Sequence, residues 1–317
     1  MTLQNLKDIT NNFCEKMIVG RGGFGVVYKG LLGDGKMIAV KKLVQSISGS
    51  QKPFENEINL LMKLKHPNIV HLVSYCYETQ HLHNTYEGKL IFAENTQCLL
   101  CLEYLPNGSL EKYITDASCG LDWPTRYKII EGISYGLQYL HEQDGGPIIH
   151  LDLKPGNILL DEQMLPKLTD FGLSRLNDEK QTIRTKNISG TLGYMPPEYL
   201  QGMVTPMSDI FSLGVIIMEV ITGQKKYLDD IGTPSTVFIE LALQKWRDVL
   251  QKGPSYTSLQ KDCQQIKRCI QVGLMCLNPE RTKRPTMKKI IVMLQGLESI
   301  NWDITNGYQA TPSVEEP

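Results

Sequence analysis

The sequence predicts an α+β protein with two unequal lobes, a small strand-rich lobe followed by a larger, mostly helical one. In the first third of the chain, short apolar runs alternate with polar or glycine positions, whereas apolar side chains recur at helical spacing over most of the remainder. The pattern changes at Pro106, Asn107 and Gly108, which together form a chain-breaking signal. A chain of 317 residues is long enough for one large domain with two such lobes.

The small lobe is predicted to contain four strand regions and one main helix. The strand regions are residues 17–31, 37–43, 69–77 and 98–104, and the helix spans 53–65. Residues 78–97 are predicted to be a polar insertion with a turn at Glu87 and Gly88. His81 and His83 alternate in this insertion, but alternation on a loop is a weak metal signal, and solvated side chains are the favoured interpretation.

The larger lobe is predicted to be built mainly from helices. An amphipathic helix is expected over 123–142, and further helices over 208–222, 238–251, 262–277 and 286–297. The polar residues 301–317 predict a disordered tail. The expected division is an N-terminal extension (1–13), a small lobe (14–102), a hinge (103–108), a large lobe (109–300) and the tail.

Composition argues against several classes of function. The formal net charge of −1 lacks the cation excess of a general nucleic-acid or anionic-membrane binder. Cys98 and Cys101 form a CxxC pair, but no second pair accompanies them, so a buried strand is favoured over a metal site. The polar start and the short apolar run at 210–218 predict neither a signal peptide nor a membrane span. A reducing, cytoplasmic location is expected, or the inner face of the plasma membrane if a receptor recruits or contains the chain.

The stretch from His150 to Asn157 is the most informative, because it places an acid, a base and an amide at fixed offsets. Asp152 can accept a hydroxyl proton, Lys154 can hold a phosphoryl group, and Asn157 can ligate a metal ion. Phosphoryl transfer to an alcohol requires such a set.

A glycine-rich loop precedes this stretch, with Gly20, Gly22, Gly23 and Gly25 in a GxGxxG pattern. A dinucleotide fingerprint of this form would be followed by a helix. A strand pattern follows instead, which favours a lid over phosphates and disfavours a nicotinamide-dependent dehydrogenase.

Three charged residues fit the same chemistry. Lys41 ends a predicted strand and needs a partner if it is buried, and Glu57 on the following helix offers one. A lone pair of this kind is more often a surface ion pair worth ~0–1 kcal/mol, so its weight comes from its position between the two loops. Asp170 follows a predicted strand 18 residues after Asp152, and a carboxylate there can ligate Mg²⁺.

Six motifs, including the glycine-rich loop, the 150–157 stretch and the motif that begins at Asp170, resemble those of eukaryotic protein kinases in their order along the chain. The resemblance covers residues 13–297. The local sequences of residues 22–30, 105–110 and 190–194 resemble those of plant receptor-like kinases, and Lys154 is typical of the serine/threonine class. The resemblance implies a bilobal protein-kinase fold and an ATP-dependent Ser/Thr protein kinase. It also implies an ion pair of Glu198 with Arg284. Asp209 would either hold the backbone of the catalytic loop or act as a helix N-terminal acid.

The resemblance further implies a site for ATP and Mg²⁺, or Mn²⁺ in its place. The implied ATP-binding residues, beside Leu102 in the gatekeeper position, are Gly20, Gly22, Gly23, Gly25, Val27, Ala39, Lys41, Glu103, Leu105 and Leu160. The implied catalytic residues are Asp152, Lys154, Lys41 and Glu57, and the implied metal ligands are Asn157 and Asp170.

One residue departs from the family pattern in the catalytic loop. Leu151 stands where the family most often has an arginine, which pairs with a phosphorylated residue of the activation segment. We therefore expect activity that depends little on phosphorylation there. The candidate regulatory positions are Leu151, Thr182, Thr185, Ser189 and Thr191, of which Thr191 could instead shape the substrate site.

The resemblance implies protein substrates and a receptor or co-receptor kinase as partners, in plant receptor-like signalling. Within that family, the replacement of the catalytic-loop arginine by Leu151 points to immune signalling. The competing interpretation is a pseudokinase scaffold, which binds nucleotide or partners without transferring phosphate. A pseudokinase would be expected to lack a catalytic group, but all of the implied catalytic and metal-binding residues are present.

Overall fold

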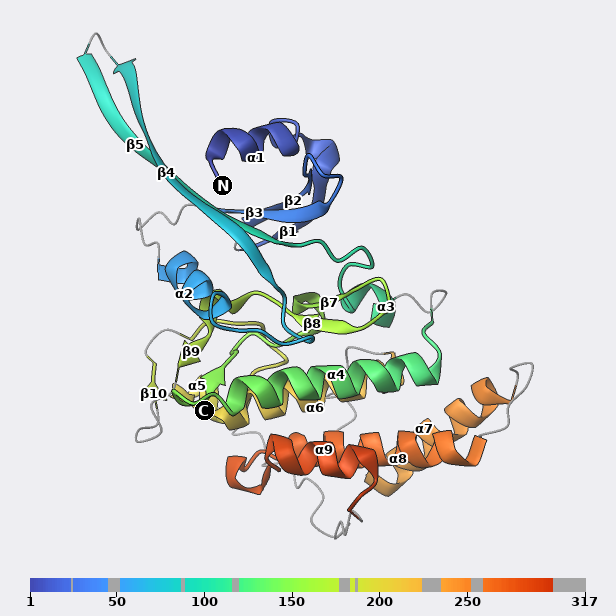
Figure 1. Ribbon diagram of the computed structural model, residues 1–317. Helices are drawn as coiled ribbons and strands as arrows, with labels where there is room; N and C mark the ends of the chain where they lie inside the picture. The colour runs from blue at the N-terminus through green and yellow to red at the C-terminus, as the bar shows by residue number, and fades with distance from the viewer. Residues whose placement is uncertain are drawn as a thin grey trace, which may run out of the picture.

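The computed structural model describes residues 1–23, 25–44, 52–86, 89–115, 120–176, 183–185, 188–223, 235–251 and 259–298, and for 81–93, 183–184 and 235 it describes the backbone alone. A β-sheet lobe lies above a mostly helical lobe, which confirms the predicted α+β, two-lobed fold (Figure 1). The predicted tail, 301–317, lies outside the described residues.

The N-terminal lobe is built on a five-stranded antiparallel sheet with the order β1-β2-β3-β5-β4. Its strands are β1 (Ile18–Gly22), β2 (Gly25–Leu31), β3 (Met37–Leu43), β4 (Leu72–Tyr86) and β5 (Lys89–Glu103). Strand β3 has the bounds predicted from the sequence, and Cys98 and Cys101 lie in a strand as expected.

Two predictions for β4 and β5 were wrong. Strand β4 begins at Leu72 rather than at 69, because Ile69 forms only an isolated bridge to Leu168. The segment expected to be a polar insertion continues both strands as a ribbon that extends beyond the sheet (Figure 1). Polar residues can pair across such a ribbon, as the hydroxyl groups of Thr79 and Thr96 do at 3.0 Å. The turn residues and the histidine side chains of this ribbon lie outside the described parts.

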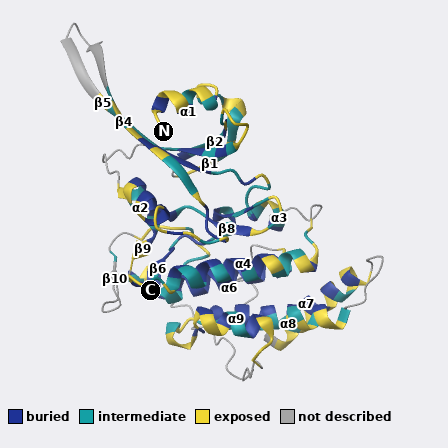
Figure 2. Ribbon diagram, in the orientation of Figure 1, coloured by how far each residue is buried: buried dark blue, intermediate teal, exposed yellow. Residues whose placement is uncertain are grey.

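Helix α1 (Leu3–Ile9) was not predicted, and it packs on the sheet. Leu3 and Leu6 are buried against side chains of β2, β4 and β5, whereas the outward side of the helix is exposed (Figure 2). The segment has only seven helical residues, too few for a clear period in the sequence. Residues 1–13 therefore contribute to the core of the small lobe.

Helix α2 (Lys52–Leu61) lies between the sheet and the large lobe, and it ends four residues before the predicted 65. The residue before a proline disfavours helical backbone, and His66 precedes Pro67, so the chain leaves the helix through a turn ahead of this pair. Its buried side includes Phe54, Glu57 and Ile58, so the sequence directs one carboxylate inward among apolar side chains.

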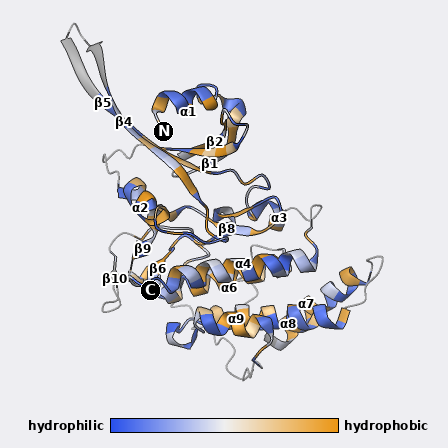
Figure 3. Ribbon diagram, viewed as in Figure 1, coloured by the Kyte–Doolittle hydropathy of each residue, from blue (hydrophilic) through white to orange (hydrophobic). Residues whose placement is uncertain are grey.

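The C-terminal lobe contains the five helices predicted from the sequence and two shorter ones among its described residues. They are α4 (Trp123–His141), α6 (Pro206–Thr222), α7 (Ser235–Leu250), α8 (Leu259–Cys276) and α9 (Met287–Gln295), with the shorter α3 (Glu111–Thr115) and α5 (Pro197–Leu200). Helix α6 is buried and apolar along most of its length (Figures 2 and 3). A Cβ atom on Gly214 would lie 2.8 Å from that of Cys276, so glycine permits the close approach of α6 and α8. No helix within the described residues is long and apolar enough to cross a lipid bilayer.

Short strands position the loops between the lobes. They are β6 (Ile148–Ile149), β7 (Ile158–Leu160), β8 (Pro166–Leu168), β9 (Arg175–Leu176), β10 (Ile183–Arg184) and β11 (Met203–Val204). The pairs β6–β9, β7–β8 and β10–β11 are antiparallel. The loop that carries Asp152 thus connects β6 to β7, and Asp170 lies between β8 and β9.

Candidate active site

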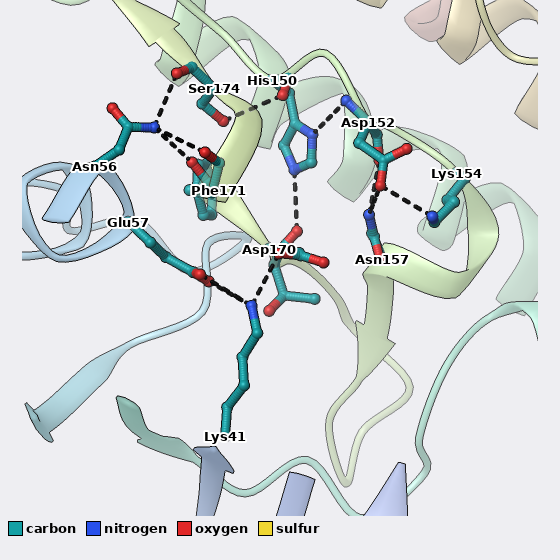
Figure 4. A network of polar contacts seen from close by, with 12 residues as sticks. Lys41, Asn56, Glu57, His150, Asp152, Lys154, Asn157, Asp170, Phe171 and Ser174 are labelled. Atoms are coloured by element: carbon teal, nitrogen blue, oxygen red, sulfur yellow. Dashed lines mark hydrogen bonds and ion pairs between the residues drawn. The ribbon is translucent and has the colours of Figure 1, made fainter. Parts of the chain in front are cut away.

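A buried cluster of one cation and two carboxylates connects the two lobes (Figure 4). The Lys41 Nζ atom lies 2.9 Å from Glu57 Oε2 and 2.9 Å from Asp170 Oδ1. Antiparallel pairing opposite Val27 and Leu100 fixes Lys41 within the sheet. Three elements that are distant in sequence therefore meet at one ammonium group.

The environment keeps Lys41 protonated. Burial by itself lowers the pKa of Lys41, but the charges of Glu57 and Asp170 outweigh it and raise the pKa to about 12. Burial raises the pKa of Glu57, an effect that the neighbouring carboxylate increases and Lys41 opposes. The ammonium group is therefore a permanent positive charge between the sheet and the helical lobe.

A second polar cluster surrounds Asp152, which is buried. Its Oδ2 atom accepts hydrogen bonds from Asn157 Nδ2 and Lys154 Nζ, each at 2.9 Å. Its Oδ1 atom accepts a hydrogen bond from the Thr191 hydroxyl group, with 2.8 Å between the two oxygen atoms. The same hydroxyl oxygen lies 2.7 Å from Lys154 Nζ. The side chains predicted from the 150–157 stretch are thus brought together, with Thr191 added from a distant segment.

The backbone of this loop is held by Asp209 from helix α6. Asp209 accepts the backbone N–H groups of His150 and Leu151 at 2.8 and 3.0 Å, and its Oδ2 atom lies 3.0 Å from His141 Nε2. Both roles expected for Asp209 are observed, because it lies in the first turn of α6 and also contacts the loop backbone. The His150 ring in turn lies 3.0 Å from the Thr169 carbonyl, just before Asp170.

Two residues of the site have left-handed backbone conformations. Leu151 has φ 69° and Asp170 has φ 70°, a region that side chains other than Asn and Asp rarely adopt. Conformations of this kind cost energy and persist where surrounding contacts hold them, often at functional sites. Here the Asp209 carboxylate and the Lys41 ammonium supply such contacts.

Several of the residues implied to bind ATP are apolar or belong to the glycine-rich loop. Leu102 and Leu160 are buried, and Ala39 pairs opposite Leu102. Gly25 has no room for a side chain, because a Cβ atom would lie 2.3 Å from the Lys42 carbonyl oxygen. A Cβ atom on Gly22 or Gly23 would have no neighbour within 4 Å among the described residues, so this loop presents bare backbone. Bare N–H groups suit phosphate oxygens.

The site suits a divalent metal ion that takes some of its ligands from the protein and the others from the phosphates of a nucleotide. Among the described residues, no group of three or more His, Cys, Asp and Glu side chains could hold a metal by itself. Mg²⁺ typically takes one or two protein oxygens, with phosphate oxygens and water as the remaining ligands. Asn157 and Asp170 offer oxygen donors of this type beside the permanent charge of Lys41.

The candidate regulatory residues have different surroundings. Thr182 lies outside the described residues. The backbone N–H of Thr185 donates to the Gly202 carbonyl at 2.9 Å, and Ser189 is exposed. Thr191 contacts the catalytic cluster, which favours its role in shaping the substrate site.

Among the described residues, Leu151 lies in an apolar cluster. It packs with Met195 against the buried side chains of Ile149, Tyr199 and Val204. The hydroxyl group of Tyr199 also donates to the Ser189 carbonyl at 2.8 Å. An apolar cluster therefore occupies the surroundings in which an arginine was expected from the resemblance.

Two further sets of contacts hold segments on either side of the site in place. The expected Glu198–Arg284 pair is present and buried, with 2.9 Å between Arg284 Nη2 and Glu198 Oε2. Sequence reasoning missed Asn56, whose amide group contacts the chain after Asp170. Its position directly before Glu57 was the only available signal.

Comparison with known proteins places these features in a family. The protein kinase domain family matches residues 13–293. Cysteine-rich receptor-like protein kinase 26 of Arabidopsis thaliana is 39% identical over 305 residues, which cover 92% of this chain and 43% of that protein. G-type lectin S-receptor-like serine/threonine-protein kinase SRK of the same species is 37% identical over 90% of this chain and 33% of its own length. Cysteine-rich receptor-like protein kinase 6 of Oryza sativa subsp. japonica is 37% identical over 93% of this chain and 41% of its own length. The chain thus spans less than half the length of these relatives.

Proposed function

Because this chain belongs to the protein kinase family, we propose that it is an active enzyme that transfers the γ-phosphate of ATP to Ser and Thr hydroxyl groups of proteins. The observation that carries the proposal is the arrangement around Asp152, whose carboxylate contacts Lys154, Asn157 and Thr191 at once. A scaffold without catalytic activity has no need for this arrangement.

In this proposal, residues 103–108 form the hinge on which the adenine ring lies. The N–H group of Glu103 donates to the His71 carbonyl at 3.0 Å, and the adenine ring would meet the backbone of Glu103 and Leu105. The Glu103 carboxylate contacts Lys167 Nζ at 2.9 Å, which fixes the hinge against the large lobe. Val27, Ala39 and Leu160 would cover the two faces of the ring.

The phosphates would lie beneath the glycine-rich loop, where Lys41 neutralises their charge. Asn157 and Asp170 would hold Mg²⁺, or Mn²⁺ in its place. When bound, such an ion neutralises charge that develops on the transferring phosphoryl group. Glu57 keeps the Lys41 ammonium oriented, because both of its carboxylate oxygens lie within 3.1 Å of Nζ.

Asp152 would act on the substrate hydroxyl, and Lys154 on the phosphoryl group. Removing the hydroxyl proton requires an acceptor that is held in one orientation, and three hydrogen bonds fix this carboxylate. The Lys154 ammonium lies beside it and supplies positive charge where the phosphoryl group would pass. Thr191 fixes both groups and ties them to the segment that would bind the substrate chain.

The test is phosphoryl transfer from radiolabelled ATP to a generic protein acceptor with Mg²⁺ present. Asp152→Asn keeps the side-chain shape, and we expect it to lower turnover by about 10²- to 10⁴-fold, the usual contribution of a general base. Asp144→Asn changes an exposed acid in a nearby loop and serves as the matched control. If wild-type protein binds ATP but transfers phosphate no faster than Asp152→Asn, the enzyme proposal fails and the pseudokinase scaffold is supported.

We also propose that activity depends little on phosphorylation of the activation segment. Leu151 and the cluster that it packs against are apolar, so a phosphate group would gain no charge-assisted bond from these side chains. The contacts of Tyr199 with Ser189 hold the segment without a phosphate.

The partners in this proposal are protein substrates and a receptor or co-receptor kinase. The support is the similarity to receptor-like kinases of plants, of which this chain covers only part. We propose immune signalling as the pathway because Leu151 stands in place of the catalytic-loop arginine, a departure that the resemblance associates with such signalling. Mapping the proteins phosphorylated by the wild type but not by Asp152→Asn in a plant extract would identify substrates and test both points.

A further inference from the structure

Asn56 connects helix α2 directly to the turn that follows Asp170 (Figure 4). Its Nδ2 atom donates to the carbonyl oxygens of Phe171 and Ser174 at 3.0 and 2.9 Å, and it lies 3.4 Å from that of Gly172. Asn56 and Phe171 are 115 residues apart in sequence. One side-chain amide therefore contacts carbonyl groups at both ends of the stretch formed by the short turn Phe171–Leu173 and Ser174.

The turn is also fixed from its other side. The hydroxyl group of Ser174 donates to the His150 carbonyl at 3.2 Å, and the Phe171 ring packs near the His150 ring. Ser174 and Phe171 are fully buried. The turn thus lies between α2 and the catalytic loop, and Asn56 donates the hydrogen bonds to its carbonyl groups from the α2 side.

Asn56 and Glu57 act on the same element by two routes. Glu57 reaches Asp170 through the Lys41 ammonium and also accepts the backbone N–H of Phe171, whereas Asn56 donates to backbone carbonyl groups just after Asp170. Asp170 itself has a left-handed backbone, which neighbouring contacts must maintain. A shift of α2 would weaken both routes together.

The carbonyl groups bound by Asn56 have other donors, so its main effect is on position. The Phe171 carbonyl also accepts the backbone N–H of Ser174 at 3.1 Å, and the Ser174 carbonyl accepts Arg175 Nη1 at 3.1 Å. Removing the Asn56 amide would therefore leave neither carbonyl buried without a partner, and a large loss of stability is not expected.

We propose that Asn56 is a positioning residue that couples the location of α2 to the orientation of Asp170. This inference rests on the proposed function for its consequence in catalysis, because Asp170 would act there as a metal ligand. Loss of two hydrogen bonds of ordinary strength would shift the equilibrium away from the observed turn by roughly 5- to 100-fold. The apparent affinity for Mg²⁺·ATP falls once the competent turn is no longer the main population.

The decisive variant is Asn56→Asp, which has the same shape but places an acceptor against three carbonyl oxygens. Asn59→Asp is the matched control, since it makes the same change at an exposed position of the same helix. By calorimetry, we expect Asn56→Asp to weaken binding of Mg²⁺·ATP by about 5- to 100-fold. Adenosine, which has no phosphate or metal to reach Asp170, should bind both variants and wild type equally.

Hydrogen exchange of the nucleotide-free protein separates this inference from the proposed function. The 170–176 region should exchange faster in Asn56→Asp than in wild type and in Asn59→Asp. Faster exchange in a protein whose wild type transfers no phosphate would support the coupling and refute the proposed activity. Unchanged exchange with unchanged Mg²⁺·ATP binding, or equal weakening of adenosine, would overturn the inference.

Two further variants cover a failure of Asn56→Asp to fold. Asn56→Ala removes the donor without adding charge and should show the same contrast between the two ligands. Asn56→Gln retains the amide on a longer stem and should recover part of the Mg²⁺·ATP affinity. Equal behaviour of Ala and Gln would contradict the role assigned to the amide.

Discussion

The segment from Asp170 to Glu198 is anchored in different ways at its two ends. The near end, at Asp170 and the following turn, is held by polar contacts from β3, from α2 and from the catalytic loop. The far end is held within the C-terminal lobe by the buried Glu198–Arg284 pair and by the apolar cluster around Tyr199. The first set of contacts spans both lobes, and the second belongs to one.

This difference indicates which end can respond to movement of the lobes. Hydrogen bonds and ion pairs at the near end have narrow distance limits, so a shift of α2 relative to the catalytic loop breaks them. The far end keeps its partners during such a shift, because they all move with it. We infer that the far end provides a stable platform for the substrate, while the near end reports on the position of α2.

The largest effect should come from breaking the ion pair at the far end. Arg284→Met leaves the buried Glu198 without its cation, and we expect the free energy of unfolding to fall by about 3–5 kcal/mol. Urea unfolding measures this. Lys283→Met is the matched control, because it removes an exposed partner of Glu280 and should cost no more than about 1 kcal/mol. Equal losses in the two variants would contradict the structural role of Arg284.

The near end should affect activity more than stability. Lys41→Met combined with Glu57→Gln removes both charges of one pair and leaves the partly exposed Asp170 without its cation, so we expect a smaller loss of stability than at Arg284. We expect kcat/KM for ATP to fall about 10²- to 10³-fold, as for loss of a preorganised electrostatic group. Lys42→Met, one residue further along β3, should retain activity. An active double variant would show that the near end does not serve catalysis.

The smallest effect should come from Leu151→Arg, which adds a cation to the apolar cluster of the far end. We expect phosphoryl transfer to persist and to acquire a dependence on segment phosphorylation of roughly 10- to 100-fold, from one charge-assisted bond. Comparing turnover before and after phosphatase treatment measures this dependence. A wild type that phosphatase inactivates would contradict the proposal that Leu151 frees the enzyme from phosphorylation.

The sequence predicted the site residues better than it predicted their neighbours. Lys41 lies in a motif within strand β3, Asp152 and Asp170 lie in motifs that follow short strands, and the order of these motifs indicated that they would meet. Helix α1 was missed because its seven residues show too little periodicity. The ribbon of β4 and β5 was missed because polar composition indicated a loop, whereas strand pairing depends on the opposite strand.

By itself, the sequence determined the two-lobed architecture, the order of the main elements and the groups available for chemistry. These follow from periodicity and from short motifs, which are local properties of the chain. Only the tertiary structure decided that Asn56 contacts the turn after Asp170, that Thr191 joins the Asp152 cluster, and that Leu151 packs against Tyr199. Each of these contacts joins segments distant in sequence over a few ångströms, so it depends on how the lobes and loops pack together.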